Sequence, residues 1–177
     1  EYETELFAGR VSNIVLGKAY AQATHSTERA PNGRLRELDE RVLRFGGGNG
    51  LRISLLEEVY LNASYEYATR LPTAEETFGD GALIVENPRL ESERSHNLNL
   101  GVFGEHSGAR AEGVRASVEV FARFASDLLS LLSSGTYYRY DNVLAARVLG
   151  TSASVGYSGR GQLWGVEARG AYQDTRN

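Results

Sequence analysis

The sequence lacks cysteine and methionine and has only three prolines among its 177 residues. Without cysteine, disulfide bonds and thiolate metal sites are excluded. The chain begins at Glu1 without a charged segment followed by an apolar one, so we expect a processed chain or an internal piece of a longer protein. The longest apolar run, LLSLL at 128–132, is far below the roughly 20 residues of a membrane-spanning helix. Any contact with a membrane must then be made by strands.

Charge and composition narrow the remaining classes. The net charge is −4, which gives no bulk attraction for nucleic acid. Hydrophobic residues make up 41% and charged residues 24% of the chain, which argues against disorder. Twenty glycines and ten tyrosines with so few prolines favour many strands joined by turns. The length suits one domain or part of a larger one.

Hydrophobic side chains alternate along several segments. In VYLNASYEYAT, which starts at Val59, apolar or aromatic residues occupy every second position. The segments VRASVEVFARFA at 114–125 and LWGVEARGAYQD at 163–174 repeat this pattern. A period of two predicts half-buried strands. The alternation often continues for about ten residues and ends in aromatic residues, which is typical of the lipid-facing side of a transmembrane barrel.

The pattern predicts an all-β fold, an antiparallel meander of long strands that forms part of a transmembrane β-barrel. Every connection can be a hairpin, and no crossover helix is visible. Residues 26–40 and 70–92 form long polar connections, 105–113 is short and turn-like, and 125–135 fits either a strand or a bend. Short turns at one end of the strands and long loops at the other are typical of outer-membrane β-barrels. The predicted strands lie near 13–24, 42–55, 58–69, 94–105, 113–125, 136–145, 151–158 and 162–174.

The pleat of a strand sends alternate side chains to opposite faces, so the same pattern assigns sides. The residues expected on the lipid-facing surface are Leu61, Ala63, Tyr65, Val118, Val120, Trp164 and Val166. Those expected to face the lumen are Asn62, Ser64, Glu66, Arg115, Glu119, Glu167 and Arg169.

Two motifs flank the long connection at 70–92. At its start stand Arg70, Pro72 and Glu75 or Glu76. From its end onward come, in order, Asn87, Pro88, Leu90, Glu93, Ser95, Asn97 and Gly101. Further downstream lie YDNV at 140–143 and GVEARG at 165–170. Because these motifs follow one another in this order, the chain resembles the C-terminal barrel region of the TonB-dependent outer-membrane receptors. The resemblance extends from about residue 42 to residue 174. It departs from the family pattern at Ser92, where the family has proline, and the plug domain and the terminal strand with its final aromatic residue are absent from the sequence.

The resemblance implies that residues 1–177 are part of a 22-stranded barrel in the outer membrane of a Gram-negative bacterium. Such a barrel belongs to an active transporter that imports a scarce ligand, such as a metal chelate, with energy from the TonB complex. The implied partners are outer-membrane lipid, the rest of the barrel, the plug domain, TonB through that plug, and a ligand that the sequence does not identify. No enzymatic activity, cofactor or nucleic-acid partner is implied.

Two other functions fit the residues. About eight strands suffice for a small closed outer-membrane barrel with a structural or adhesive role. The strands of a soluble β-rich binding domain would also show alternating hydrophobic and polar residues, although such strands are usually shorter.

The connection at 70–92 is predicted to have an ordered base and a mobile tip. Pro72 cannot donate to a strand ladder, Asn87-Pro88 starts a turn, and the Arg70 fork can bind carboxylates. The base residues expected to order the loop are Arg70, Pro72, Glu75, Glu76, Asn87, Pro88, Glu93, Ser95 and Asn97. The tip, which is expected to face ligand or plug, contains Phe78, Gly79, Asp80, Leu83, Ile84 and Val85. Its glycines suit a flexible turn, and its apolar end has no obvious partner.

Other motifs predict no catalytic or metal-binding residue. FGGGNG at 45–50 lacks the lysine and hydroxyl of a phosphate-binding loop, so its glycines are expected to serve a curved strand or a tight bend. His25, His96 and His106 are not spaced as metal ligands. Acid–base chemistry by paired carboxylates would need a cleft and a perturbed pKa, which no motif indicates.

Overall fold

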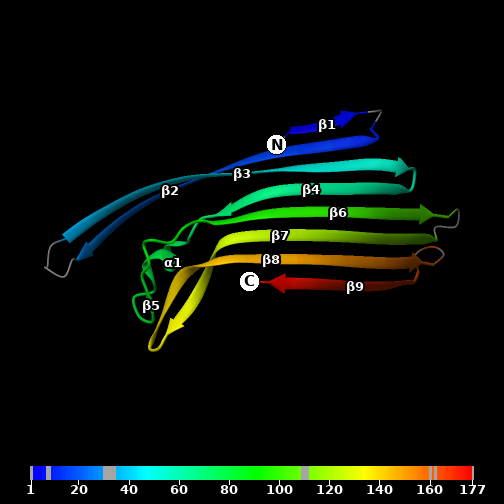
Figure 1. Cartoon of the computed structure of the whole chain (residues 1–177). Helices are drawn as coiled ribbons and strands as arrows, with labels where there is room; N and C mark the ends of the chain where they lie inside the picture. The colour runs from blue at the N-terminus through cyan, green and yellow to red at the C-terminus, as the bar shows by residue number, and fades with distance from the viewer. Residues whose placement is uncertain are drawn as a thin grey trace.

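The computed structural model describes residues 2–6, 9–29, 35–108, 112–159, 161 and 163–176. Nearly all of them lie in one sheet of long strands (Figure 1). The strands are β1 (Tyr2–Leu6), β2 (Val11–Arg29), β3 (Leu35–Leu56), β4 (Val59–Arg70), β5 (Ile84–Val85), β6 (Glu93–Ser107), β7 (Gly113–Ser134), β8 (Tyr137–Ser158) and β9 (Gly165–Arg176), with one short helix, α1 (Ala74–Phe78).

The long strands pair in chain order, β1-β2-β3-β4-β6-β7-β8, and β9 pairs with β8. All of these pairs are antiparallel, which confirms the predicted meander. The exception is β5, which the sequence did not predict as a strand and which pairs with β8 in parallel. The nine-stranded sheet remains open in the described part of the chain, because β1 and β9 lie at its edges and do not pair with each other.

The strands are longer than the sequence predicted. β3, β7 and β8 have 22 residues each, which corresponds to roughly 70 Å of extended chain. The predicted strands at 136–145 and 151–158 are one strand, and the ambiguous segment 125–135 continues β7. Much of the predicted polar connection at 26–40 is the paired end of β2 and β3. Polar residues can continue a hairpin as long as the backbone groups of its two strands pair with each other. The hairpins β2–β3 and β7–β8 therefore extend beyond the neighbouring strands (Figure 1).

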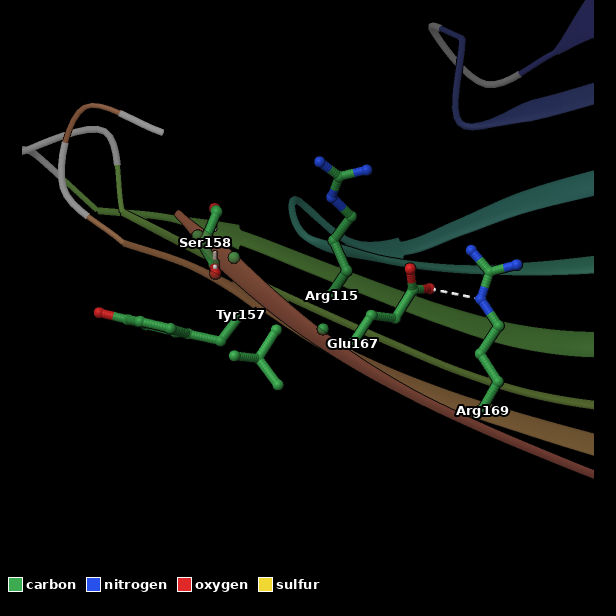
Figure 2. Close-up of a pocket in the computed structure, with 9 residues that line it drawn as sticks. Arg115, Tyr157, Ser158, Glu167 and Arg169 are labelled. Carbon is green, nitrogen blue, oxygen red and sulfur yellow. Dashed lines mark hydrogen bonds and ion pairs between the residues drawn. The ribbon is translucent and has the colours of Figure 1, made fainter. Parts of the chain in front are cut away.

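The register sorts side chains onto two faces. Leu61 pairs with Val102 and Val102 with Val118, whereas Asn62 pairs with Gly101 and Gly101 with Glu119. The predicted lipid-facing residues in the strands therefore share one face, called here the outer face, and the predicted lumen-facing residues share the inner face. Trp164, just before β9, packs on Tyr157 of the outer face with ring centroids 5.4 Å apart. In Figure 2, Tyr157 points away from the side that carries Arg115 and Arg169.

The sheet does not build a core of its own. Among the described residues, Ala125 is the one buried hydrophobic residue, and large apolar side chains along the outer face are exposed. The accessible surface is 12,696 Å², against roughly 8,500 Å² for a compact protein of 19.4 kDa. The apolar outer face is therefore left uncovered within the described part of the chain. Among the residues that the structure describes, no helix is both long and apolar enough to cross a membrane.

The glycine run at 45–50 lies within β3, as predicted for a curved strand. A Cβ on Gly48 would lie 2.9 Å from the Tyr65 carbonyl oxygen on β4, closer than a real Cβ approaches. Gly46 stands equally close to the Tyr67 carbonyl oxygen. Because these inner-face positions carry no side chain, Lys18 on β2 reaches across β3 and places its Nζ 2.7 Å from Glu66 Oε1 on β4.

Candidate functional site: the connection between β4 and β6

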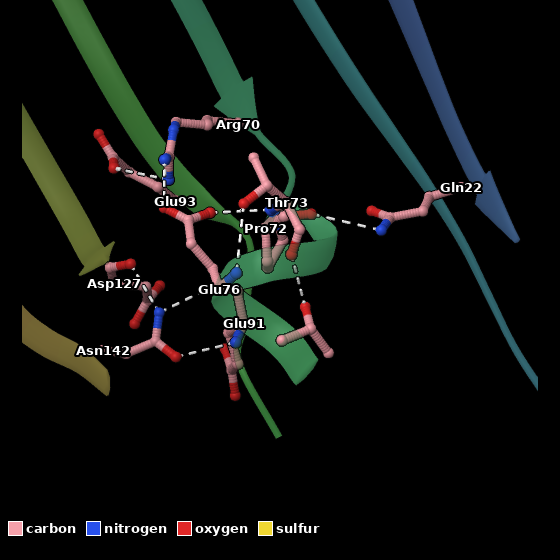
Figure 3. A network of polar contacts seen from close by, with 10 residues as sticks. Gln22, Arg70, Pro72, Thr73, Glu76, Glu91, Glu93, Asp127 and Asn142 are labelled. Atoms are coloured by element: carbon pink, nitrogen blue, oxygen red, sulfur yellow. Dashed lines mark hydrogen bonds and ion pairs between the residues drawn. The ribbon is translucent and has the colours of Figure 1, made fainter. Parts of the chain in front are cut away.

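The connection begins with a short helix fixed to the end of β4. Thr73 is the N-cap of α1, and its hydroxyl accepts a hydrogen bond from the Glu76 N–H at 3.3 Å. The Glu76 carboxylate accepts in return from the Thr73 N–H at 2.8 Å, which completes a capping box. Arg70 at the end of β4 donates to the same carboxylate at 2.5 Å (Figure 3). The helix is thus oriented by three bonds to one buried glutamate.

Glu76 stays ionised although it is only 7% exposed. Burial raises the pKa of its carboxyl, but the Thr73 N–H and the Arg70 guanidinium outweigh burial and lower the pKa below its ordinary value of 4.5. A carboxyl group with a lowered folded-state pKa stabilises the fold above its unfolded pKa, and this contribution is lost as the pH falls through the folded value.

Acidification is therefore expected to loosen the helix end of the loop. In the full-length protein, a spin label at Ala82 should be immobilised at pH 7 and gain mobility as the pH falls below 4.5. Glu76→Gln, which cannot form the ion pair, should raise the mobility at pH 7 and reduce the pH dependence. An identical pH profile for the variant and the parent would show that Glu76 does not hold the loop.

The predicted base residues fall into separate groups. Arg70 also approaches Glu93, at 3.9 Å, and Arg123 on β7 donates to Glu93 at 3.3 Å. Asn97 donates to Ser95 at 3.3 Å, and among the described residues its side chain forms no bond to the Arg70 group. The Glu75 side chain is exposed, and its backbone carbonyl accepts from the Gly79 N–H at 2.8 Å. The Pro72 carbonyl accepts from Gln22 on β2 at 3.3 Å.

The second half of the connection, residues 83–91, runs along the edge of β8 and is called here the strap. The Tyr138 N–H donates to the Leu83 carbonyl at 2.9 Å, and Ile84 and Val85 continue the pairing as β5. Further along, the Asn87 amide donates to the Tyr140 carbonyl at 2.9 Å, so the residue of the predicted Asn-Pro turn binds β8 and not the Arg70 group. The adjacent Pro88 lines a cavity described below.

Asn142 fixes the end of the strap. Its side chain accepts from the Glu91 N–H at 2.8 Å and donates to the Glu91 carbonyl at 3.0 Å and to the Asp127 carbonyl at 2.7 Å (Figure 3). Asp127 has φ 57 within β7 and pairs through its carboxylate with Arg94. The sequence suggested no role for Asn142 or Asp127, and YDNV at 140–143 is the one motif that contains either residue.

Asn142→Ala is expected to release the end of the strap, because it removes three hydrogen bonds at once and leaves the Glu91 backbone without a side-chain partner. At about 1 kcal/mol for each hydrogen bond, the free energy needed to open the strap locally should fall by roughly 2–3 kcal/mol. Hydrogen exchange of residues 83–91 in the full-length protein measures this change. Asn99→Ala, which removes one exposed bond to Ser64 on the inner face, is the control and should leave strap exchange unchanged.

The tip is hydrogen-bonded in the structure, and its mobility stays a prediction. The Asp80 carboxylate accepts from the N–H groups of Ala82, Leu83 and Ile84 at 2.8–2.9 Å. The N–H groups of Ile84 and Ala82 hold the pKa of Asp80 below its ordinary value. Gly79 has φ 74 and touches the Ile84 carbonyl so closely that a Cβ would lie 2.0 Å from that oxygen. Phe78 is half-buried, and Leu83 and Val85 remain exposed.

A cavity of about 290 Å³ separates the connection from the inner face of β2 and β3. Its wall on the sheet is formed by Gln22, Thr24, Val42 and Arg44, and its wall on the connection by Pro72, Thr77, Pro88, Arg89, Leu90, Glu91 and Ser92. Most of these side chains are polar, so the cavity suits a hydrophilic group. It joins residues of β2 and β3 to residues of the strap, and no sequence motif predicts that these segments meet.

A second pocket lies at the opposite end of the inner face (Figure 2). Its charged residues are paired: Arg169 donates to Glu167 at 2.7 Å, and Arg115 lies 3.5 Å from Glu105. Among the described residues, no cluster of three or more histidine, cysteine, aspartate or glutamate side chains could hold a metal ion.

A family model described as TonB dependent receptor-like, beta-barrel matches residues 25–177. The chain therefore belongs to the TonB-dependent receptor β-barrel family, as the motifs around residues 70–101 predicted. No curated protein sequence matches it.

Two solved structures share the fold. One is a structure titled copper transporter OprC, with 18% identity over 97% of this chain and a TM-score of 0.68. The other is the hemophore receptor HasR of Serratia marcescens, solved as a double mutant with its hemophore HasA and heme, with 15% identity over 86% of this chain and a TM-score of 0.63. This chain spans 28% and 30% of the lengths of those two proteins.

Proposed function

We propose that this chain forms part of the wall and outer mouth of an outer-membrane transporter that imports a scarce ligand, such as a metal chelate, with energy from the TonB complex acting through a plug domain. The outer face is covered by membrane lipid, and the inner face lines the lumen. The long connections lie on the extracellular side. The chain contributes to binding and passage of the ligand and performs no catalysis.

The observation that carries the proposal is the position of the connection between β4 and β6. It lies over the inner face, where Gln22 on β2 bonds to Pro72, and it extends along the edge of β8. A loop held at both sides in this way stands at the mouth of the lumen and leaves a polar cavity beneath it. Family membership and the open sheet support the same function.

The small closed barrel is the less favoured alternative. A nine-stranded sheet that closed on itself would pair β1 with β9, and the described residues of these strands lie at opposite edges (Figure 1). A soluble binding domain is disfavoured because the outer face leaves large apolar side chains such as Val118 and Val166 exposed.

Deletion of residues 78–85 from the full-length protein is expected to reduce ligand uptake severalfold without preventing barrel assembly, because this segment holds the connection to β8 and no long strand depends on it. Uptake of a panel of radiolabelled metal chelates by cells, with and without TonB, measures the effect. The double variant Glu57→Ala, Glu58→Ala in the turn between β3 and β4, at the other end of the sheet, is the control. If no chelate enters in a TonB-dependent manner, the transport function is wrong.

A further inference from the structure

Two arginines line the cavity beneath the connection, one from each wall. Arg44 lies on the inner face of β3, where its pairing partner on β2 is Tyr20. Arg89 lies in the strap, two residues after Asn87, whose side chain accepts from the Arg89 N–H at 3.3 Å. The fold therefore brings together two guanidinium groups that are 45 positions apart in the sequence.

Neither guanidinium is paired with a carboxylate in the part of the chain that the structure describes. Several arginines elsewhere on the sheet pair with a carboxylate, as Arg70 does with Glu76. Among the described residues, no carboxylate lies within ion-pair distance of Arg44 or Arg89, and Arg44 donates only to the neighbouring Leu43 carbonyl at 3.2 Å. The carboxylate that lines the cavity, Glu91, instead lies 3.9 Å from Arg94.

The remaining lining suits an oxygen-rich group. The Thr24 hydroxyl forms no bond within the described residues and can donate to a bound oxygen. Gln22 and Thr77 are held by Pro72 and Thr73 carbonyls, which keeps that side of the cavity polar and fixed. A volume of about 290 Å³ is at the lower end of ligand sites, so it accommodates an anionic arm and not a large ring system.

We propose that this cavity binds an oxyanion group, carboxylate or phosphate, with Arg44 and Arg89 as the charged donors on its two sides. Planar guanidinium forks match such groups with paired hydrogen bonds. The site depends on the proposed transport function only in that the bound anion is taken to be part of the transported ligand. The transported ligand is then an anionic one, and its binding joins the strap to the wall formed by β2 and β3.

The test is direct binding to the purified full-length protein, which requires no transport. Calorimetric titration with citrate, and separately with inorganic phosphate, should show saturable binding of at least one, and the anion that binds identifies the source. Arg44→Gln and Arg89→Gln should each weaken Kd by about tenfold or more, because each removes charge-assisted hydrogen bonds. Arg89→Lys, which keeps the charge but loses the fork, should give an intermediate loss.

Arg139→Gln is the matched control, because it removes one exposed arginine on the β7–β8 hairpin that pairs with Asp141 and does not line the cavity. It should bind within about twofold of the parent. Barrel integrity of every variant is checked by heat-modified gel mobility. No saturable binding of either anion up to about 10 mM, or equal losses in the control and the cavity variants, would overturn the site. Anion binding without TonB-dependent uptake would leave the site standing and contradict only the transport function.

Discussion

Val120→Arg is expected to destabilise the full-length barrel by about 2–4 kcal/mol, one of the largest effects of any single substitution on the outer face. Val120 pairs with Leu100 on β6 and Thr151 on β8, and it is 47% exposed in the isolated sheet. On the lipid side an arginine must either lose its hydration or distort the bilayer. Urea unfolding of the protein in lipid bilayers measures the change in free energy of unfolding.

Glu119→Arg is the control for Val120→Arg. The two positions are adjacent on β7, and their side chains point to opposite faces. On the inner face an arginine remains in a polar lumen, so this variant should retain most of the parent's stability. Equal losses at both positions, or a larger loss at Glu119, would mean that the outer face is not the lipid face.

Gly48→Val is expected to cost about 1–3 kcal/mol of stability or to reduce assembly. The new Cβ would lie 2.9 Å from the Tyr65 carbonyl oxygen, and backbone on a neighbouring strand cannot move aside cheaply. Gly50→Val provides the comparison, because it lies on the same strand and face and its Cβ would meet nothing within 4 Å. The amount of folded protein in outer membranes measures assembly, and the urea concentration at the unfolding midpoint measures stability, for each of the two variants. Similar behaviour of the two variants would remove the steric explanation for the glycine run.

Local pattern was enough to predict most of the long strands and the faces of their residues, but not β1 or β5. Successive side chains of any strand point to opposite faces, whichever strands lie beside it. Leu61 and Asn62 could therefore be assigned to opposite faces from the sequence. Strand ends were less predictable. Ser126 and Leu128 continue β7 because Ala145 and Val143 on β8 complete their backbone pairs, and this partner is not visible in the segment itself.

The candidate site was predictable only in part. Arg70 and Glu76 are six residues apart, and a capping box joins Thr73 to Glu76 within one turn, so short-range chemistry indicated an ordered loop base. Asn142 binds Glu91 across 51 positions. Its role follows from the meander, which brings the edge of β8 beside the strap, and no local motif carries that information.

The pairing of β5 with β8 also bears on the exposure of strand edges. From Ser158 to Arg147 one side of β8 is occupied by β9, but the hairpin continues outward to Tyr137. A bare strand edge of that kind is a template on which another polypeptide can add a strand. The parallel pairing at Tyr138 and Arg139, together with the bond from Asn87 to Tyr140, fills that side with the protein's own backbone and side chains. The strap therefore covers, within this chain, part of a strand edge that could otherwise accept another strand.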